Sequence, residues 1–91
     1  MENITASQVK DVATENGFSR IGHHKCGMCG YPTGYIIDGD HVAFDAGCNC
    51  TGRYLSRPSS FDDIARTFNM QTPEIRARMW EDFKAGKPLI D

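Results

Sequence analysis

Four cysteines form two close pairs along this 91-residue chain. Cys26 and Cys29 are separated by two residues, and Cys48 and Cys50 are separated by one. Between the pairs, Asp38-Gly39 is a strong signal for a type I′ hairpin turn. A hairpin would carry the second pair back beside the first, so that four thiolates converge on one point. Such a set of ligands suits a tetrahedral metal ion.

The same thiols allow other chemistry. A thioredoxin-like redox motif would need Cys26 and Cys29 to open a helix in a βαβ unit, whereas here residues 30–32 lead into the expected hairpin. Four thiolates could also hold iron, and two disulfides could form after oxidation or export. We expect a structural zinc ion held by all four cysteines, because four protein ligands leave no open position for water or substrate.

The hairpin expected over residues 31–47 joins two β-prone runs, Tyr35–Ile37 and His41–Phe44. A turn at positions 38 and 39 places Tyr35 opposite Val42, with Ile37 and Phe44 on the same face. Continued beyond the strands, this register places Cys29 opposite position 48.

Helices are expected both before and after the hairpin in the sequence. In residues 1–20, Thr5 and Gln8 form a capping box, and Gly17 marks the end of the helix. In residues 58–86, Ser60 and Thr72 are N-caps for two successive helices that are joined by a short turn at residues 69–71.

The cysteine motifs carry a resemblance to a known family. The segment Cys26-Gly-Met-Cys29-Gly30-Tyr31 resembles the knuckle of zinc ribbons and rubredoxins, and a β-hairpin between two cysteine pairs is similar to the zinc-ribbon fold. The resemblance covers about residues 23–52, and Cys48-Asn-Cys50 departs from the usual Cys-x-x-Cys spacing. The whole chain also resembles small zinc-ribbon proteins encoded in bacteriophage genomes, a resemblance that names no activity.

These patterns predict an α+β fold: a small zinc-ribbon β-hairpin with an N-terminal helix and a C-terminal helical pair. We expect one zinc-stapled domain over residues 1–91, with the N-terminal helix at 1–20, the ribbon at 21–57, the helical pair at 58–86 and a tail at 87–91. Val, Ile, Leu and Phe make up only 17 of the 91 residues, so the hydrophobic core is small. A bound metal ion would supply stability that such a core lacks.

Charge and patterning exclude several functions. A net charge of −2 argues against the broad basic surface that binds nucleic acid non-specifically. The apolar runs are too short to cross a membrane, and the N-terminus lacks the features of a secretory signal, so we expect a cytoplasmic protein. The sequence contains no recognisable acid pair, nucleophile–base pair or phosphate-binding loop, and we therefore expect no enzymatic activity.

We expect instead a regulator or adaptor that binds a protein of the transcription, replication or defence machinery. Its contact surface would be the outer face of the hairpin and the edge of the ribbon. The residues of this surface are His41, Arg53, Tyr54 and Arg57.

The alternative is a small DNA- or RNA-binding regulator. The segment Phe61–Trp80 resembles a helix-turn-helix, which would place Arg76 and Arg78 at a nucleic-acid groove. A packed helical hairpin is a simpler interpretation of the same spacing. Residues 58–91 carry five basic and six acidic groups, so a protein partner is favoured over nucleic acid.

Overall fold

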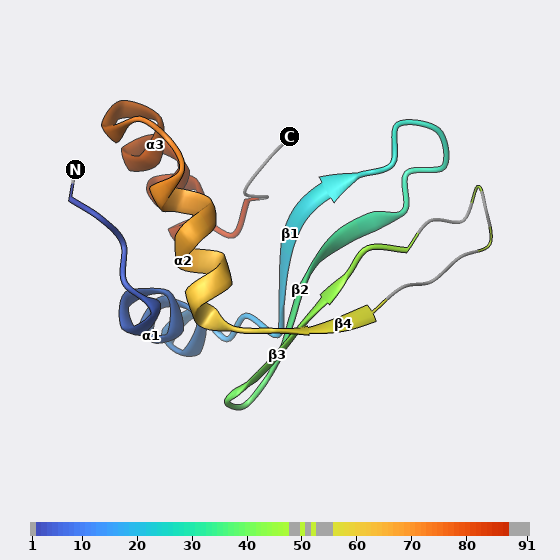
Figure 1. Ribbon diagram of the computed structural model, residues 1–91, viewed down its shortest axis with the longest axis horizontal. Coiled ribbons are helices and arrows are strands. Elements are labelled where there is room, and N and C mark those ends of the chain that lie inside the picture. The colour runs from blue at the N-terminus through green and yellow to red at the C-terminus, as the bar shows by residue number, and fades with distance from the viewer. Residues whose placement is uncertain (1, 48–49, 51, 53–55, 88–91) are drawn as a thin grey trace.

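A computed structural model describes residues 2–47, 50, 52 and 56–87 of the chain, so only Lys87 of the predicted tail is included. These residues form three helices and a four-stranded antiparallel sheet (Figure 1). The elements are α1 (Ala6–Asn16), β1 (Arg20–Lys25), β2 (Pro32–Asp38), β3 (His41–Asp45), β4 (Ser56–Ser59), α2 (Phe61–Asn69) and α3 (Pro73–Lys84). The predicted α+β arrangement, with an N-terminal helix and a C-terminal helical pair, is confirmed.

Helix α1 begins and ends where the sequence predicts. The Thr5 hydroxyl accepts a hydrogen bond from the backbone N–H of Gln8 (3.2 Å), and the Gln8 side chain accepts one from the backbone N–H of Thr5 (2.8 Å). Gly17 has a φ of +71°, the left-handed conformation that ends a helix without a steric penalty. Ile4 and Val9, which lie on either side of the cap, are both buried and fix the start of the helix against the core.

The two C-terminal helices also begin at their predicted caps. The hydroxyls of Ser60 and Thr72 each accept a hydrogen bond from the backbone N–H three residues later, at 3.3 and 3.4 Å. Asn69, predicted to lie in the turn, ends α2 instead. Its side-chain amide accepts a hydrogen bond from the N–H of Ile4 (2.7 Å) and donates one to the carbonyl of the same residue (2.8 Å). This pair of bonds fixes the N-terminal segment against the end of α2.

The sheet is larger than the predicted hairpin. Strands β1 and β4 flank the hairpin, which gives the order β1-β2-β3-β4. Pro58, the first residue of the segment predicted to hold the helical pair, lies in β4 instead, where an edge strand tolerates a residue without an N–H. Strand β1 comes so close to β2 that a Cβ on Gly34 would lie 2.2 Å from the carbonyl oxygen of Ile21. Only glycine fits that position of β2.

The hairpin turn lies one residue later than predicted, at positions 39 and 40, and Asp38 pairs with His41 at the end of the strands. Gly39 has a φ of +61° at the first turn position, which is where a type II′ turn requires glycine. The predicted type I′ turn would instead need a positive φ at Asp38, which costs more for a residue with a side chain.

The predicted register is therefore wrong by two positions. Tyr35 pairs with Phe44 rather than with Val42, and Val42 pairs with Ile37. Because the shift is even, these four side chains stay on one face of the sheet. The observed register places an apolar residue opposite Ile37, whereas the predicted register would place Asp40 there.

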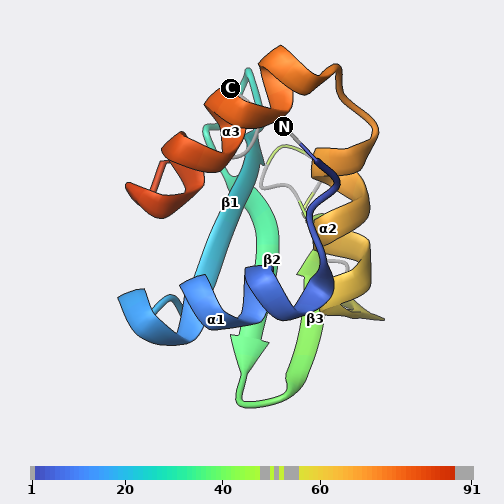
Figure 2. The ribbon, with the colours of Figure 1, turned by 90° about the vertical axis from the view of Figure 1, so that its left-hand side faces the viewer.

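The helices gather on one side of the sheet (Figures 1 and 2). The core between them contains Phe68 and Phe83 from the helices, and Ile21, Tyr35 and Val42 from the sheet. None of the helices in the described residues combines the length and the apolar character that a membrane-spanning helix requires.

Arg76 on α3 is buried, with 7% of its surface exposed. Its guanidinium donates hydrogen bonds to the backbone carbonyls of Phe68 (3.2 Å), Asn69 (3.3 Å) and Gln71 (2.9 Å). These carbonyls lie at the end of α2, where helical carbonyls lack partners within the helix and a cation is favoured by the helix dipole. The sequence proposes Arg76 as a contact for a partner, but the structure places its guanidinium between the two helices.

We predict that Arg76→Met lowers the free energy of unfolding by about 2 kcal/mol, because it removes the buried hydrogen bonds that join α3 to the end of α2 and the turn after it. Arg78→Met, at an exposed position on the same helix, removes the same charge and should change stability by less than about 0.5 kcal/mol. Urea unfolding of both variants measures the difference. Equal stabilities would show that Arg76 does not hold the helical pair together.

Candidate metal centre

Three cysteines lie together at the end of the sheet that is opposite the β2–β3 turn. The sulfur atoms of Cys26, Cys29 and Cys50 all lie within 4.8 Å of one another. The Sγ atoms of Cys26 and Cys50 are 3.6 Å apart, which is too far for a disulfide bond between these two residues. Cys48, the fourth predicted ligand, lies outside the described residues.

The sulfur spacing fits one tetrahedral ion. Four sulfurs bound to zinc at about 2.3 Å lie about 3.8 Å from one another along the edges of the tetrahedron. The observed separation of 3.6 Å between Cys26 and Cys50 differs from this value by a small movement of either side chain. The three sulfurs, all within 4.8 Å of one another, are therefore close enough to hold one metal ion.

Two hydrogen bonds close the loop that carries the first pair of cysteines. The N–H of Cys26 donates to the carbonyl of Tyr31 (3.1 Å), and the N–H of Gly30 donates to the carbonyl of Cys26 (2.9 Å). Gly30 has a φ of +71°, so the chain can turn sharply directly after Cys29. The loop thereby keeps both cysteines at the end of β1 and β2.

The observed register brings Cys50 toward this loop. If the pairing of β2 with β3 is continued past the ends of the strands, Cys29 lies opposite Cys50. The predicted register places Cys29 opposite position 48 instead. The convergence of the two cysteine segments is thus confirmed for Cys50, although the register that produces it differs from the prediction.

Asp45, at the end of β3, links the two segments that carry the cysteines. Its carboxylate accepts hydrogen bonds from the guanidinium of Arg20 (3.0 Å), the hydroxyl of Tyr31 (3.1 Å) and the backbone N–H of Gly47 (3.1 Å). Tyr31 closes the first cysteine loop, and Gly47 directly precedes Cys48. Asp45 is only 8% exposed, so its charge depends on these donors.

These donors lower the pKa of Asp45 below its ordinary value. The N–H of Gly47 has the largest effect, and the Tyr31 hydroxyl and the Arg20 guanidinium add to it, while burial acts in the opposite direction. The hydrogen bond to Asp45 also raises the pKa of Tyr31, because it favours the protonated phenol, and burial acts in the same direction. Asp45 is ionised at neutral pH and Tyr31 keeps its proton.

Sequence analysis did not single out Asp45. A lone acidic residue at the end of an apolar strand, three positions before a cysteine, is the one signal that the sequence offers for it. The partners come from three separate segments, so their convergence becomes visible only in the folded chain.

Of the residues predicted to form the contact surface on the hairpin, His41 and Arg57 are described, and they do not share one face of the sheet. His41 is exposed beside the hairpin turn, at the other end of the sheet from the cysteines. Arg57 is exposed in β4, where it pairs with Phe44 and places its guanidinium 5.3 Å from the centre of that ring. His41 and Phe44 point to opposite faces of β3, because side chains alternate along a strand. Arg53 and Tyr54 lie outside the described residues.

When the chain is compared with protein-family models, with curated proteins and with solved structures, none of them matches. A functional conclusion must therefore come from the chain's own residues and their geometry.

We predict that Asp45→Asn lowers the free energy of unfolding by about 1–2 kcal/mol at neutral pH, because charge-assisted hydrogen bonds are replaced by weaker ones. The pKa of Asp45 is lower in the folded protein than in the unfolded chain. The stabilisation is therefore fully present above about pH 4 and is lost as the pH falls through the lowered value.

Urea unfolding of the wild type and of Asp45→Asn at pH 7, 5 and 3 measures this effect. The difference between the two proteins should stay constant from pH 7 to 5 and shrink at pH 3. Asp38→Asn removes a charge at an exposed position of β2 and serves as the control. A difference between wild type and Asp45→Asn that does not change with pH would contradict the assignment.

Proposed function

We propose that this chain is a non-enzymatic zinc-binding interaction module, in which a zinc ion fixes a surface that binds a partner protein. The convergence of Cys26, Cys29 and Cys50 within 4.8 Å is the observation that carries the proposal. Cys48 completes the set in this proposal, because it lies two positions from Cys50 and directly after the segment that Asp45 holds.

The spacing of 3.6 Å between the sulfurs of Cys26 and Cys50 suits a tetrahedral thiolate site, which either zinc or iron can occupy. Zinc is favoured over iron because the cysteine loop resembles the knuckle of zinc ribbons, in which zinc is the usual ion. A site with four protein ligands has no open position for a substrate, so the ion's role is structural.

A role in binding is supported by two methionines that the fold leaves exposed. Met28 lies between two of the cysteines and is 90% exposed, and Met70 at the end of α2 is 77% exposed. Exposed methionines are adaptable contact residues at protein interfaces. The proposed role is that of a regulator or adaptor that binds a protein of the nucleic-acid or defence machinery.

The alternative, a regulator that reads nucleic acid with α2 and α3, has less support. Of the two arginines predicted for that contact, Arg76 is engaged with the carbonyls at the end of α2, and Arg78 is the exposed one. The whole chain has a net charge of −2, which gives no long-range attraction to a polyanion.

We predict one zinc ion per chain in protein purified under reducing conditions, measured by mass spectrometry of the metal. Cys26→Ser should lose the ion and much of the folded structure, because structural zinc supplies on the order of 10 kcal/mol of binding free energy to small domains. Met28→Ser changes the same loop without removing a thiol and should keep the zinc.

Circular dichroism before and after chelation completes this test. Protein that contains no zinc, or that keeps an unchanged spectrum after complete removal of the ion, would disprove the zinc module. Iron in place of zinc would be identified in the same measurement.

We further predict that zinc-loaded protein captures a protein partner from a cell lysate and that nuclease treatment of the lysate leaves this capture intact. Chelated protein should capture less of the same partner, because the binding surface is no longer fixed. Capture that disappears with nuclease treatment would instead support the nucleic-acid alternative.

A further inference from the structure

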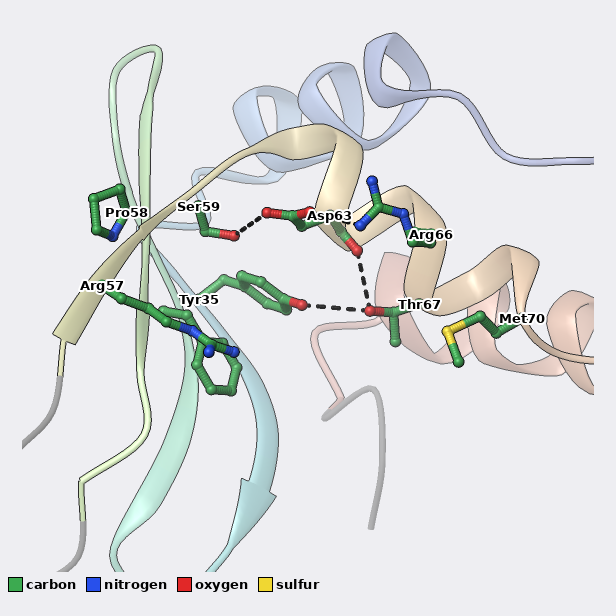
Figure 3. Close-up of a pocket in the computed structure, with 9 residues that line it drawn as sticks. Tyr35, Arg57, Pro58, Ser59, Asp63, Arg66, Thr67 and Met70 are labelled. Atoms are coloured by element: carbon green, nitrogen blue, oxygen red, sulfur yellow. Dashed lines mark hydrogen bonds and ion pairs between the residues drawn. The ribbon is translucent and has the colours of Figure 1, made fainter.

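A groove of about 460 Å³ lies between the sheet and helix α2, on the face of the sheet that the helices cover (Figure 3). Tyr35 and Phe44 line it from the sheet, and Thr67 and Met70 line it from α2. Its volume is within the range of ligand sites in proteins. The groove is open to solvent, and none of the described cysteines lines it.

The acidic residue in the described lining of this groove is already engaged. One carboxylate oxygen of Asp63 accepts a hydrogen bond from Arg66 (3.1 Å), and the other accepts one from the Ser59 hydroxyl (2.9 Å). The hydroxyls of Tyr35 and Thr67 lie 3.3 Å apart and are hydrogen-bonded to each other. An incoming anion would therefore meet a carboxylate whose charge is locally compensated.

Arg57 offers the groove a cation for which no acidic partner occurs in the described part of the chain. Its guanidinium lies 5.3 Å from the centre of the Phe44 ring. An arginine placed over an aromatic ring keeps the edge of its planar group available for two parallel hydrogen bonds to a carboxylate. With Arg57, Arg66 and Asp63 in the lining, the groove has a charge of +1 in a protein whose net charge is −2.

The other end of the groove contains an exposed methionine. Arg57 and Met70 lie toward opposite ends of the view in Figure 3. Met70 is 77% exposed, which leaves its thioether available to an apolar side chain of a ligand. The groove thus presents a cation at one end and an adaptable apolar contact at the other.

We propose that this groove binds an acidic peptide segment of a partner protein, with an Asp or Glu side chain on Arg57 and an apolar side chain against Met70. The proposal rests on the proposed function, because it names the binding surface of the interaction module and the chemistry of its partner. A peptide fits better than a nucleic acid, since binding to nucleic acid depends on contacts with many phosphates and the described lining holds two arginines.

A random heptapeptide library displayed on phage, selected against zinc-loaded wild-type protein, tests this inference. Selected sequences should share an Asp or Glu near an apolar residue. Synthetic copies should bind Arg57→Gln about tenfold to a hundredfold more weakly than wild type, as expected for loss of a charge-assisted pair. Met70→Ser should weaken binding several-fold.

Arg78→Gln is the matched control, because it removes an exposed arginine on α3 outside the groove lining, and it should bind the peptides as wild type does. Thermal unfolding and zinc content of each variant separate binding from folding. If zinc is present and no selected peptide depends on Arg57, the groove proposal is wrong while the zinc module stands. Arg57-dependent binding of a random single-stranded RNA 20-mer that excludes the peptides would also overturn it.

Discussion

The carboxylate of Asp45 accepts hydrogen bonds from three separate segments of the chain. The donors are Arg20 at the start of β1, Tyr31 at the end of the first cysteine loop, and the backbone N–H of Gly47 before the second cysteine pair. A buried charge is tolerated only where donors surround it, so these three segments must come together for Asp45 to be ionised in the folded protein. The cysteine segments extend past the ends of the strands, and the described apolar core lies among the helices and the strands themselves. Hydrogen bonds to the ionised carboxylate of Asp45 therefore shape the region where the cysteines converge. Hydrophobic packing shapes the helices and the strands.

Consecutive residues of β3 serve the two candidate sites. Phe44 lines the groove, and the guanidinium of Arg57 lies over its ring. Asp45 accepts hydrogen bonds from the two segments that hold the cysteines. Because side chains alternate along a strand, these two residues face opposite sides of the sheet. The strand thus connects the cysteine cluster to the groove through its backbone, although no described side chain belongs to both.

Signals in the sequence were sufficient where structure depends on neighbouring residues. Thr5, Gln8 and Gly17 fixed α1, and Ser60 and Thr72 marked the starts of α2 and α3, because caps act within one helical turn. The missed features depend on contacts between distant segments. Strands β1 and β4 lack apolar alternation and form only because the hairpin offers them an edge. The burial of Arg76 needs the end of α2 beside it, and the role of Asp45 needs three other segments.

The two-residue difference between the predicted and observed registers shows how little separates two pairings of this hairpin. Tyr35, Ile37, Val42 and Phe44 share one face in either pairing, so hydrophobic burial is nearly degenerate between them. The turn at Gly39 favours one pairing. The cysteines do not separate the two pairings, because Cys29 lies opposite a cysteine in both: Cys50 in the observed pairing and position 48 in the predicted one. The alignment of this hairpin therefore depends on the turn at Gly39 and on the cross-strand neighbour of Ile37, which is Val42 in the observed pairing and Asp40 in the other.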